Sequence, residues 1–385
     1  MRFESLTEQE FRDFAATSPY KSFTQTPEIA KLREKNGWTA YFLGVRGEDP
    51  SAKAPKTPNA KRDKILAATL LVAKPTFLGK SLFLAPGGPL LDLENAPLAD
   101  FFLKNLKLFV KTHNGFLLRL DPYYELRERD RDGELVENGF DHTPAKKALE
   151  KHGFKEIDGD QPKYLFALDL ESRTETELFA SFKQNTRNLI SRTARQGVTV
   201  RELTRDELPL LKGITEETAK RREFTDRPLS YYETMYDLFA PKNEVKFLLA
   251  EVEIEGVKTP LSTAMFMTYG DEVIYLFSGS DEAYMKTYNA QYAIQWHMIK
   301  YALKNGFKRY NFYGIRGLPD PSRPGYGIYR FKKGFGGRVI ELIGTYELKV
   351  TPLATLYEAL RALKAKIPRK SENNPKTAPR ARKEA

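Results

Sequence analysis

Residues Gly325-Tyr-Gly-Ile-Tyr-Arg-Phe-Lys-Lys-Gly-Phe-Gly-Gly337 are the most distinctive stretch of this 385-residue chain. Thirteen positions combine five glycines, four aromatic residues and a cluster of one arginine and two lysines. Glycine lets the backbone approach a ligand closely or adopt positive φ, and Lys332 and Lys333 offer ammonium donors. We therefore expect a loop and a strand that hold an anionic ligand. An ordinary surface hairpin with glycine turns is the alternative interpretation.

Composition is typical of a soluble globular protein, with 41% hydrophobic and 29% charged residues. The length predicts two or three domains. The absence of cysteine excludes a disulfide framework, a thiolate zinc site and a cysteine nucleophile, and it fits a reducing compartment. The first residues show no signal peptide, and no run of about 18 apolar residues predicts a membrane span.

The net charge of +11 predicts an anionic partner: phosphates, tRNA or an acidic membrane surface. Part of this charge lies in residues 49–64 and 368–385, which are rich in Pro, Lys and Ala and lack large apolar side chains. We expect both segments to be disordered. The first of them is a lysine-rich insertion that could contact RNA or anionic lipid nonspecifically.

Hydrophobic periodicity and turn residues predict an α/β order that occurs twice. In the first half we expect helices at 6–16, 27–35 and 96–112, and strands at 38–45, 65–73, 81–85 and 116–120. In the second half we expect helices at 175–195, 206–222, 230–239 and 291–304, and strands at 164–170, 198–203, 246–253, 262–269, 272–278 and 310–313.

The two halves share a local signature. A helix is followed by Asn114-Gly115-Phe116 and a strand in one half, and by Asn305-Gly306-Phe307 and a strand in the other. An Asn-Gly pair commonly ends a helix. We interpret the signature as a weak internal repeat of an α/β unit, which predicts two similar domains in tandem.

A series of short motifs, in order along nearly the whole chain, resembles the Fem family of bacterial peptidyltransferases. Each motif is modest alone, and the order of the series makes the resemblance specific. The motifs are Phe23-Thr-Gln-Thr, Gly37-Trp38, Pro86-Gly87-Gly88-Pro89, Arg119-Leu-Asp121-Pro122, Arg187-Asn-Leu-Ile190, Gly197-Val198, Asp226-Arg227, Tyr231-Tyr232, Ser278-Gly279-Ser280, Tyr292-Ala-Ile-Gln-Trp296, Tyr310-Asn-Phe-Tyr-Gly-Ile315 and Phe331-Lys332-Lys333-Gly334-Phe335.

The resemblance implies an α/β (α+β) fold of two tandem GNAT-like domains, that is, domains like the acyl-CoA N-acyltransferases. The first domain would comprise residues 1–158 plus a returning C-terminal segment, 341–385, and the second would comprise residues 159–340. Several family members insert a long coiled-coil arm in the second domain. Here residues 240–262 are short and predict a meander, so we expect no coiled-coil arm and a different grip on tRNA.

The resemblance also implies an enzyme, a tRNA-dependent aminoacyltransferase. It would move an amino acid from aminoacyl-tRNA to the stem-peptide amine of a UDP-linked or lipid-linked peptidoglycan precursor, building the interpeptide bridge. Aminoacyl-tRNA is then the donor substrate, and no cofactor is expected. The implied location is the cytoplasm, with peripheral contact to an anionic membrane. Two alternatives stay open: a GNAT-type N-acyltransferase with an acyl thioester donor, and a non-catalytic basic module that binds RNA or membrane.

By similarity to the family, Arg227 and Tyr231 bind the acceptor. Phe116, Tyr275 and Phe331 match further substrate-binding positions, and Phe116 stands where some members have Tyr. A spacing of four places Arg227 and Tyr231 on one face if the turn is helical. A surface arginine near a helix start and ordinary core packing of the aromatic residues are the alternatives.

The family also has a basic residue between the Gln-Thr motif and the Gly-Trp pair. An ungapped match places Arg33 there, and Lys31 or Lys35 could serve instead. On a helix Lys31 and Lys35 share a face, whereas Arg33 does not lie with them. A solvated charged face is nearly as good an interpretation of these three residues.

Lys332 and Asp121 are the candidate catalytic residues, because they match positions near the reacting centre and in the acceptor groove. Attack of an amine on an aminoacyl ester requires a deprotonated amine and stabilised oxygens. A protonated Lys332 could stabilise those oxygens, and Asp121 could orient or deprotonate the amine. The sequence has no HExxH, P-loop or GxSxG motif, no metal-ligand spacing of histidines and no coenzyme A phosphate loop. We therefore expect no metal and no covalent intermediate.

Overall fold

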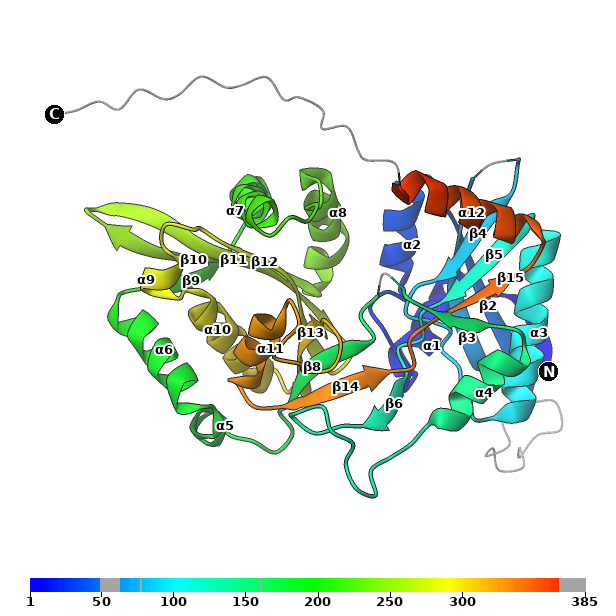
Figure 1. The fold of residues 1–385 in the computed structure, drawn as a ribbon, viewed down its shortest axis with the longest axis horizontal. Helices are drawn as coiled ribbons and strands as arrows, with labels where there is room; N and C mark the ends of the chain where they lie inside the picture. The colour runs from blue at the N-terminus through cyan, green and yellow to red at the C-terminus, as the bar shows by residue number, and fades with distance from the viewer. Residues whose placement is uncertain (49–62, 77, 160, 367–385) are drawn as a thin grey trace.

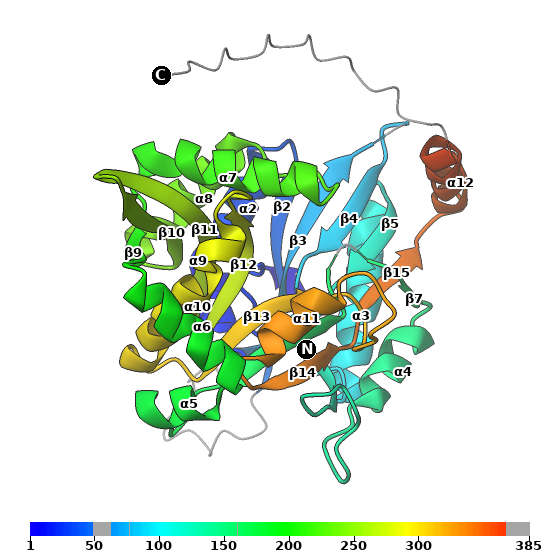
Figure 2. The ribbon, with the colours of Figure 1, turned by 60° about the vertical axis from the view of Figure 1, so that its left-hand side comes forward.

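The structure, a computed structural model, describes residues 1–48, 63–76, 78–159 and 161–366. Two mixed β-sheets form the centres of two domains that lie side by side (Figures 1 and 2). The segments expected to be disordered, 49–64 and 368–385, lie outside the described residues except for Asp63 and Lys64. For these two residues the expectation was wrong, because they begin strand β3 and pair with the end of β2.

The first sheet has seven strands in the order β1-β2-β3-β4-β5-β15-β7. Its strands are β1 (Arg2–Ser5), β2 (Thr39–Glu48), β3 (Asp63–Pro75), β4 (Ser81–Ala85), β5 (Gly115–Leu120), β7 (Lys155–Ile157) and β15 (Thr345–Lys349). The helices of this domain are α1 (Glu8–Thr17), α2 (Pro27–Glu34), α3 (Ala96–Thr112), α4 (Thr143–Lys151) and the C-terminal α12 (Leu353–Lys366). Since β15 pairs with β5, the end of the chain returns to the first domain.

The second sheet has eight strands in the order β6-β14-β8-β13-β12-β11-β10-β9. Its strands are β6 (Glu125–Glu128), β8 (Tyr164–Asp169), β9 (Thr199–Glu202), β10 (Val245–Ile254), β11 (Val257–Tyr269), β12 (Glu272–Ser280), β13 (Arg309–Ile315) and β14 (Arg338–Leu342). The helices are α5 (Glu175–Ser181), α6 (Gln184–Arg195), α7 (Leu208–Arg221), α8 (Leu229–Phe239), α9 (Met285–Tyr288), α10 (Gln291–Lys304) and α11 (Tyr326–Lys333). Strand β6, which precedes residue 158 in the chain, joins this second sheet.

Each domain contains one parallel strand pair joined by a helix. Strands β4 and β5 are connected by α3, and strands β12 and β13 are connected by α10. Asn114 (φ +59°) and Gly306 (φ +72°) supply the left-handed residue that ends each helix. The Asn-Gly-Phe signature therefore marks the same point of an α/β unit in both halves, as the repeat predicted.

The two domains are held together by an apolar cluster that crosses their boundary. Phe11 and Val72 of the first domain belong to it together with Phe247 and Met267 of the second, and all four side chains are buried. Burial of such residues is the main stabilising term in folding. This cluster therefore stabilises the contact between the two domains. Among the described residues, no helix combines the length and apolar character needed to span a bilayer.

The structure corrects two expected elements. The helix expected at 175–195 is divided into α5 and α6, because Phe182 leaves helical geometry (ψ 151°) and is buried against Trp296 and Phe335. The glycine-rich stretch is a helix, α11, rather than a loop and a strand. Its buried residues, Tyr329 and Lys332, are three positions apart and so lie on one face.

Gln25 explains the Gln-Thr motif in structural terms. Its side chain is fully buried, donates to the carbonyls of Leu70 (3.1 Å) and Pro86 (2.9 Å), and accepts from the Leu70 N–H (2.7 Å). A Cβ on Gly88 would lie 2.6 Å from Gln25 Cδ, so the amide fills the space that glycine leaves.

We expect Gln25→Leu to lower the free energy of unfolding by about 3 kcal/mol, because buried backbone groups would lose their partners. Urea denaturation measures the change. The control is Gln9→Leu, where an exposed glutamine bonds Asp13, and we expect a change within about 0.5 kcal/mol. A loss smaller than about 1 kcal/mol at Gln25 would contradict this account.

Candidate functional site

The central feature of the second domain is a divergence of its parallel strands. Strands β12 and β13 pair at only three positions, Glu272–Arg309, Val273–Tyr310 and Ile274–Asn311, although both strands continue further. In the first domain β4 and β5 stay paired to their last residues, Ala85 and Leu120. Only in the second domain do the strands therefore open a space at their carboxyl ends.

A cavity of about 690 Å³ occupies this space, and we call it the larger cavity. Its walls come from the diverging strands, from α7 and α10, and from the glycine-rich start of α11. Three cationic side chains line it, and the described residues add no carboxylate. The cations are Arg221, Arg222 and Lys332. An electropositive cavity of this kind favours an anionic ligand.

Lys332 projects from the last turn of α11 and is 5% exposed. Its ammonium donates to the carbonyl oxygens of Tyr313 (3.1 Å) and Gly314 (2.6 Å). Burial lowers the pKa of Lys332 from its usual 10.5 to about 7, because desolvation disfavours the charged form. Near neutral pH both the amine and the ammonium are therefore populated, whereas the role considered from the sequence used the protonated form alone.

A bulge in β13 aims these two carbonyls at Lys332. The pairing of β13 with β8 shifts register between Asn311 and Gly314, and Tyr313 has a φ of +64°, which few residues other than glycine adopt. The Asn311 Oδ1 accepts from the Tyr313 N–H (2.7 Å), and the Tyr313 hydroxyl donates to Gln161 Oε1 (2.7 Å). Both bonds fix Tyr313 in this strained geometry.

A second cavity, of about 420 Å³, lies between the domains, and we call it the smaller cavity. It shares Pro162 and Tyr313 with the larger cavity, so the two meet at these residues. Six carboxylates line the smaller cavity against three cations. The carboxylates are Asp121, Glu125, Asp169, Glu171, Asp271 and Glu272, and the cations are Lys21, Lys308 and Arg309. The excess of carboxylates favours a cationic group there.

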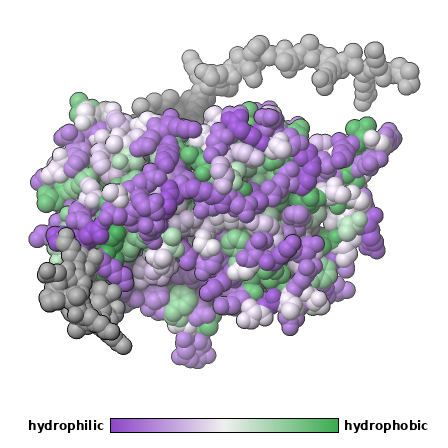
Figure 3. Space-filling view, turned by 180° about the vertical axis from the view of Figure 1, so that it is seen from behind, coloured by the Kyte–Doolittle hydropathy of each residue, from purple (hydrophilic) through white to green (hydrophobic). Residues whose placement is uncertain are grey.

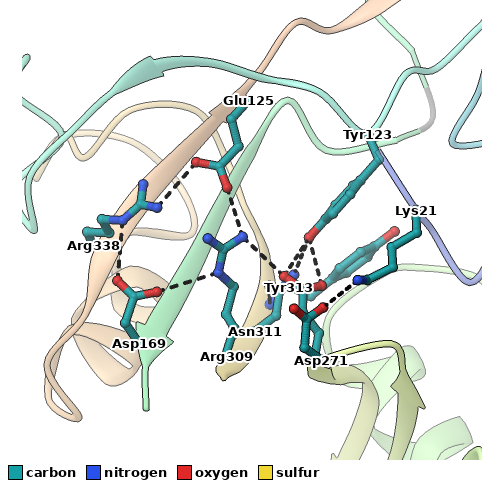
Figure 4. Close-up of polar contacts among 10 residues, drawn as sticks. Lys21, Tyr123, Glu125, Asp169, Asp271, Arg309, Asn311, Tyr313 and Arg338 are labelled. Atoms are coloured by element: carbon teal, nitrogen blue, oxygen red, sulfur yellow. Dashed lines mark hydrogen bonds and ion pairs between the residues drawn. The ribbon is translucent and has the colours of Figure 1, made fainter. Parts of the chain in front are cut away.

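Polar contacts across the domain boundary shape the smaller cavity (Figure 4). Arg309 lies between Glu125 (2.8 Å) and Glu272 (3.3 Å), and the Tyr123 hydroxyl donates to the same Glu272 (2.9 Å). Lys21 pairs with Asp271 at 3.0 Å. Burial raises the pKa of Glu272, and the Arg309 charge opposes that shift. The Tyr123 bond joins the loop after β5 to β12, the Glu125 bond joins β6 to β13, and the Lys21 pair joins the connection between α1 and α2 to the turn before β12.

Asp121 directly follows the carboxyl end of β5 and lines the smaller cavity. It accepts a hydrogen bond of 2.5 Å from Thr345 Oγ1, at the start of the returning strand β15. Burial raises the pKa of Tyr313, and the charge of Asp121 adds to this shift, so the two side chains are electrostatic neighbours. The two candidate catalytic residues therefore line different cavities, Asp121 the smaller and Lys332 the larger, and Tyr313 lines both.

Arg227, Tyr231 and Arg33 form a third group beside Tyr313. The Arg227 guanidinium lies 5.3 Å from the Tyr231 ring centre, and the Arg33 guanidinium lies 5.2 Å from that of Trp38. Burial raises the pKa of Tyr231, and the charges of Arg227 and Arg33 oppose that shift. Tyr231 and Arg227 also influence the pKa of Tyr313, so the group adjoins the point where the cavities meet.

Among the three basic residues of α2 and its cap, the structure brings Arg33 to this group. Lys31 instead pairs with Glu8 at 3.0 Å, on the side of α1. The hydrogen bond from Arg205 lowers the pKa of Asp237, on α8, and the charge of Lys35 adds to this shift. The helical phase that separates position 33 from positions 31 and 35 accounts for this difference.

The three aromatic candidates have different environments. Tyr275 and Phe331 line the larger cavity, where Phe331 packs edge-on against Tyr292 at 5.0 Å. Phe116 is fully buried under α12, where it packs edge-on against Tyr357 at 5.1 Å, and it lines neither cavity. The reason is its place at the amino end of β5, whereas the smaller cavity opens beyond the carboxyl end.

Sequence reasoning did not assign a role to several residues of the site. Tyr313 lies inside the motif 310–315, but only the structure shows its positive φ and its place between two cavities. From the sequence, Arg221 and Arg222 are predicted only to be the charged end of a helix. Gln161 lies in a loop that carries no recognisable sequence motif. A basic pair at the end of an amphipathic helix was the one available signal.

Comparisons with known proteins agree with this architecture. A profile of the FemAB family matches residues 6–259 and 254–365, and the match divides where β10 meets β11. The chain is 27% identical, over 440 aligned positions, to the protein named Aminoacyltransferase FemA from Staphylococcus aureus strains MRSA252 and MW2, covering 95% of this chain and 100% of the relatives.

Two solved structures show the fold. The crystal structure of FemX superimposes with a TM-score of 0.77 at 20% identity, covering 94% of this chain and 100% of that chain. A tandem GNAT protein from the clavulanic acid biosynthesis pathway gives 0.51 at 10% identity, covering 91% and 99%. The expected fold of two tandem GNAT-like domains is confirmed. In the described residues 240–262, the chain forms a short 3-10 turn and strands β10 and β11, so no coiled-coil arm is present there.

Proposed function

Because the chain belongs to the FemAB family, we propose that it is an aminoacyltransferase that carries an amino acid from aminoacyl-tRNA to the stem-peptide amine of a peptidoglycan precursor. The name that its relatives bear, Aminoacyltransferase FemA, supports the reaction class. One observation of the structure carries the proposal: two cavities of opposite charge meet at Tyr313, with Lys332 on one side and Asp121 on the other.

The charges of the two cavities match the two substrates of such a transfer. The donor is an ester at the end of a polyanionic RNA, and it suits the larger cavity, where cations are unopposed by described carboxylates. The acceptor is an amine that is a cation in water, and it suits the carboxylate-rich smaller cavity. Their meeting at Tyr313 brings nucleophile and ester into one place.

Lys332 suits the proton transfers of the reaction, since a pKa of about 7 lets it both accept and donate a proton at neutral pH. In the proposed step the acceptor ammonium passes a proton to Lys332, and its nitrogen attacks the ester carbonyl carbon. A C–N bond forms and the C–O bond to the ribose breaks. The nitrogen loses a second proton to water as the tetrahedral intermediate collapses, and Lys332 passes the first proton to the ribose oxygen, so the transfer is balanced with one proton released to water. The ester is already activated, and the proposal needs no cofactor.

Arg227, Arg33 and Tyr231 are proposed to hold the diphosphate of the acceptor. Arginine offers a planar fork of donors that matches phosphate oxygens. Arg227 is exposed, and within the described part of the chain no carboxylate forms an ion pair with it. Its neighbour Asp226 is anchored by Lys212 (2.8 Å) and by the Tyr232 hydroxyl (2.7 Å), which fixes the loop that presents Arg227.

Asp121 is proposed to orient the acceptor amine. Asp121→Asn keeps an acceptor oxygen for Thr345 but removes the charge, and we expect kcat/KM for the acceptor to fall about 10-fold. The control is Asp141→Asn, which changes an exposed aspartate that also accepts from a threonine, Thr143, outside both cavities. Equal rates for the Asp121 variant and the unchanged enzyme would remove this role.

The proton-transfer role of Lys332 predicts a pH dependence. The amine form accepts the proton, so kcat should rise with pH through about 7 and level off above it. A profile of kcat against pH, with saturating substrates, measures this limb. The limb should be missing in Lys332→Met, whereas a profile that is flat from acid to neutral pH in the unchanged enzyme would contradict the assignment.

The decisive experiment incubates the protein with charged total tRNA and with either the UDP-linked or the lipid-linked precursor. Mass spectrometry should show a muropeptide one amino acid heavier, and RNase treatment should abolish the product. Product that survives RNase would favour an acyl thioester donor. Binding of tRNA regardless of its charging, without any transfer, would favour a basic RNA-binding module. We place the reaction in the cytoplasm, where aminoacyl-tRNA is made, at an anionic membrane surface.

A further inference from the structure

Asn311 is a polar side chain in the interior of the second domain, where it is 1% exposed. Hydrophobic residues scattered over a hydrophilic surface, as on the rear face of this molecule (Figure 3), are ordinary in folded proteins. A buried amide is informative instead, because each of its donors or acceptors that lacks a partner costs free energy. The partners of Asn311 therefore indicate what the residue does.

Asn311 bonds to the backbone at one end of its amide and to a tyrosine at the other (Figure 4). Its Oδ1 accepts from the Tyr313 N–H (2.7 Å), and its Nδ2 donates to the Tyr123 hydroxyl (3.0 Å). Because a backbone N–H can only donate, it determines that the amide oxygen faces Tyr313 and that the NH2 group faces Tyr123. The Tyr123 hydroxyl then gives its own proton to Glu272 (2.9 Å). Every hydrogen bond in this series therefore has one defined direction.

Tyr123 belongs to the segment that crosses from the first sheet to the second, between β5 and β6. Asp121 lies in the same segment, two positions earlier. The backbone of this segment is held on the first domain, because the Tyr123 N–H donates to the Gly87 carbonyl (3.3 Å). The Tyr123 ring packs against the same small apolar cluster of β8 and β14 as Tyr313 does. The ring and the hydroxyl of Tyr123 thus both hold the segment that carries Asp121 against the second sheet.

We propose that Asn311 is a positioning residue that holds Lys332 in a fixed relation to Asp121. It anchors the β13 bulge at one end of its amide and Tyr123 at the other. The bulge carries the two carbonyls to which the Lys332 ammonium donates, at 3.1 and 2.6 Å. The consequence for the transfer rests on the proposed function, in which Lys332 moves the proton and Asp121 orients the amine. In a site of this kind a displacement of about 1 Å lowers the rate about 100-fold.

The environment of Lys332 can be measured without any substrate. Brief acetylation of the full chain with acetic anhydride over a range of pH, followed by peptide mass spectrometry, gives the midpoint at which Lys332 loses its proton, about 7 in the unchanged protein. In Asn311→Ala the carbonyls are no longer held against the ammonium, so this midpoint should fall by about one pH unit. The other charged groups of the larger cavity, Arg221 and Arg222, stay in place. An unchanged or raised midpoint would overturn the proposal.

Tyr123→Phe is the milder variant, because the packed ring stays in place and only the hydroxyl is removed. We expect kcat to fall about 10-fold in Tyr123→Phe and about 100-fold in Asn311→Ala, with KM for the donor within about twofold in both. Because Tyr123 acts through Asn311, the double variant should be no more than about twofold slower than Asn311→Ala alone. If the two losses multiplied instead, the residues would act independently and the proposed connection would be overturned.

Tyr310→Phe is the matched control, since it removes a buried hydroxyl from the residue next to Asn311 on the same strand. The Tyr310 hydroxyl donates to Gln295 Oε1 (2.7 Å), and neither residue lines either cavity. This variant should keep the Lys332 midpoint, and its kcat should stay within about twofold. Equal rate losses in Tyr310→Phe and Tyr123→Phe would reflect general destabilisation and overturn the proposal. Absence of transfer by the unchanged protein, together with the expected shift in Lys332 acetylation, would instead count against the proposed function alone.

Discussion

Lys332→Met is expected to lower kcat about 1,000-fold while making the folded protein more stable below pH 7. The loss of rate follows from removing the group that is proposed to accept and return the proton. Methionine keeps the length and unbranched shape of lysine, so the packing around α11 stays filled. Single-turnover rates with charged tRNA and acceptor measure the first effect.

The gain in stability has a definite sign. The folded protein lowers the pKa of Lys332 from 10.5 to about 7, so burial disfavours the ammonium that the unfolded chain carries. Below pH 7 Lys332 is protonated in both the folded and the unfolded protein, and the full free-energy cost of burying its ammonium is present. Between about pH 7 and 10.5 the unfolded chain binds more protons, so this penalty shrinks as pH rises. We therefore expect the variant to gain about 2 kcal/mol below pH 7 and less above it.

The control for this prediction is the adjacent residue. Lys333 pairs with Asp132 and is not among the residues that line the larger cavity, so Lys333→Met should change kcat by less than about threefold. A Lys332→Met enzyme with an unchanged rate would exclude the residue from the chemistry. A variant that is both inactive and less stable would show that Lys332 supports the fold instead.

Arg227→Gln is expected to raise KM for the acceptor about 30-fold and to leave kcat within a few-fold of the unchanged enzyme. The reason is that the proposed charge-assisted bond from Arg227 to the acceptor diphosphate would be equally strong in the ground state and the transition state. Arg227→Lys should give an intermediate KM, because lysine keeps the charge but lacks the planar fork. Initial rates over a range of acceptor concentrations provide the measurement.

Arg205→Gln is the matched control for Arg227. Arg205 is also an exposed arginine. Its Nε lies 2.6 Å from Asp237 Oδ1, and neither residue lines either cavity. Its variant should keep KM within about twofold. A fall in kcat without a change in KM for Arg227→Gln would mean that Arg227 acts on the reacting atoms and not on the diphosphate.

Local signals identified most of the regular structure. The helix expected at 96–112 and the strand expected at 81–85 have the same bounds in the structure, and the Asn-Gly-Phe signature correctly marked the repeated unit. The glycine-rich stretch was predicted as a loop and a strand rather than as helix α11. Lys332 counts as polar in a pattern of hydrophobic residues, although its side chain is buried in the fold. The short strands β6, β7, β14 and β15 carry no local signal, since their pairing partners lie far away in the chain.

The sequence alone determined which residue types were available for the chemistry and in which order they occur. Motifs led to Lys332, Asp121 and Arg227, because side-chain chemistry and short spacings are written directly in the chain. Their geometry was decided by tertiary structure. Packing divides the charges between two cavities, places Tyr313 between them and buries the Lys332 ammonium. The physical reason is that desolvation and the field of distant charges depend on neighbours that only the fold brings together.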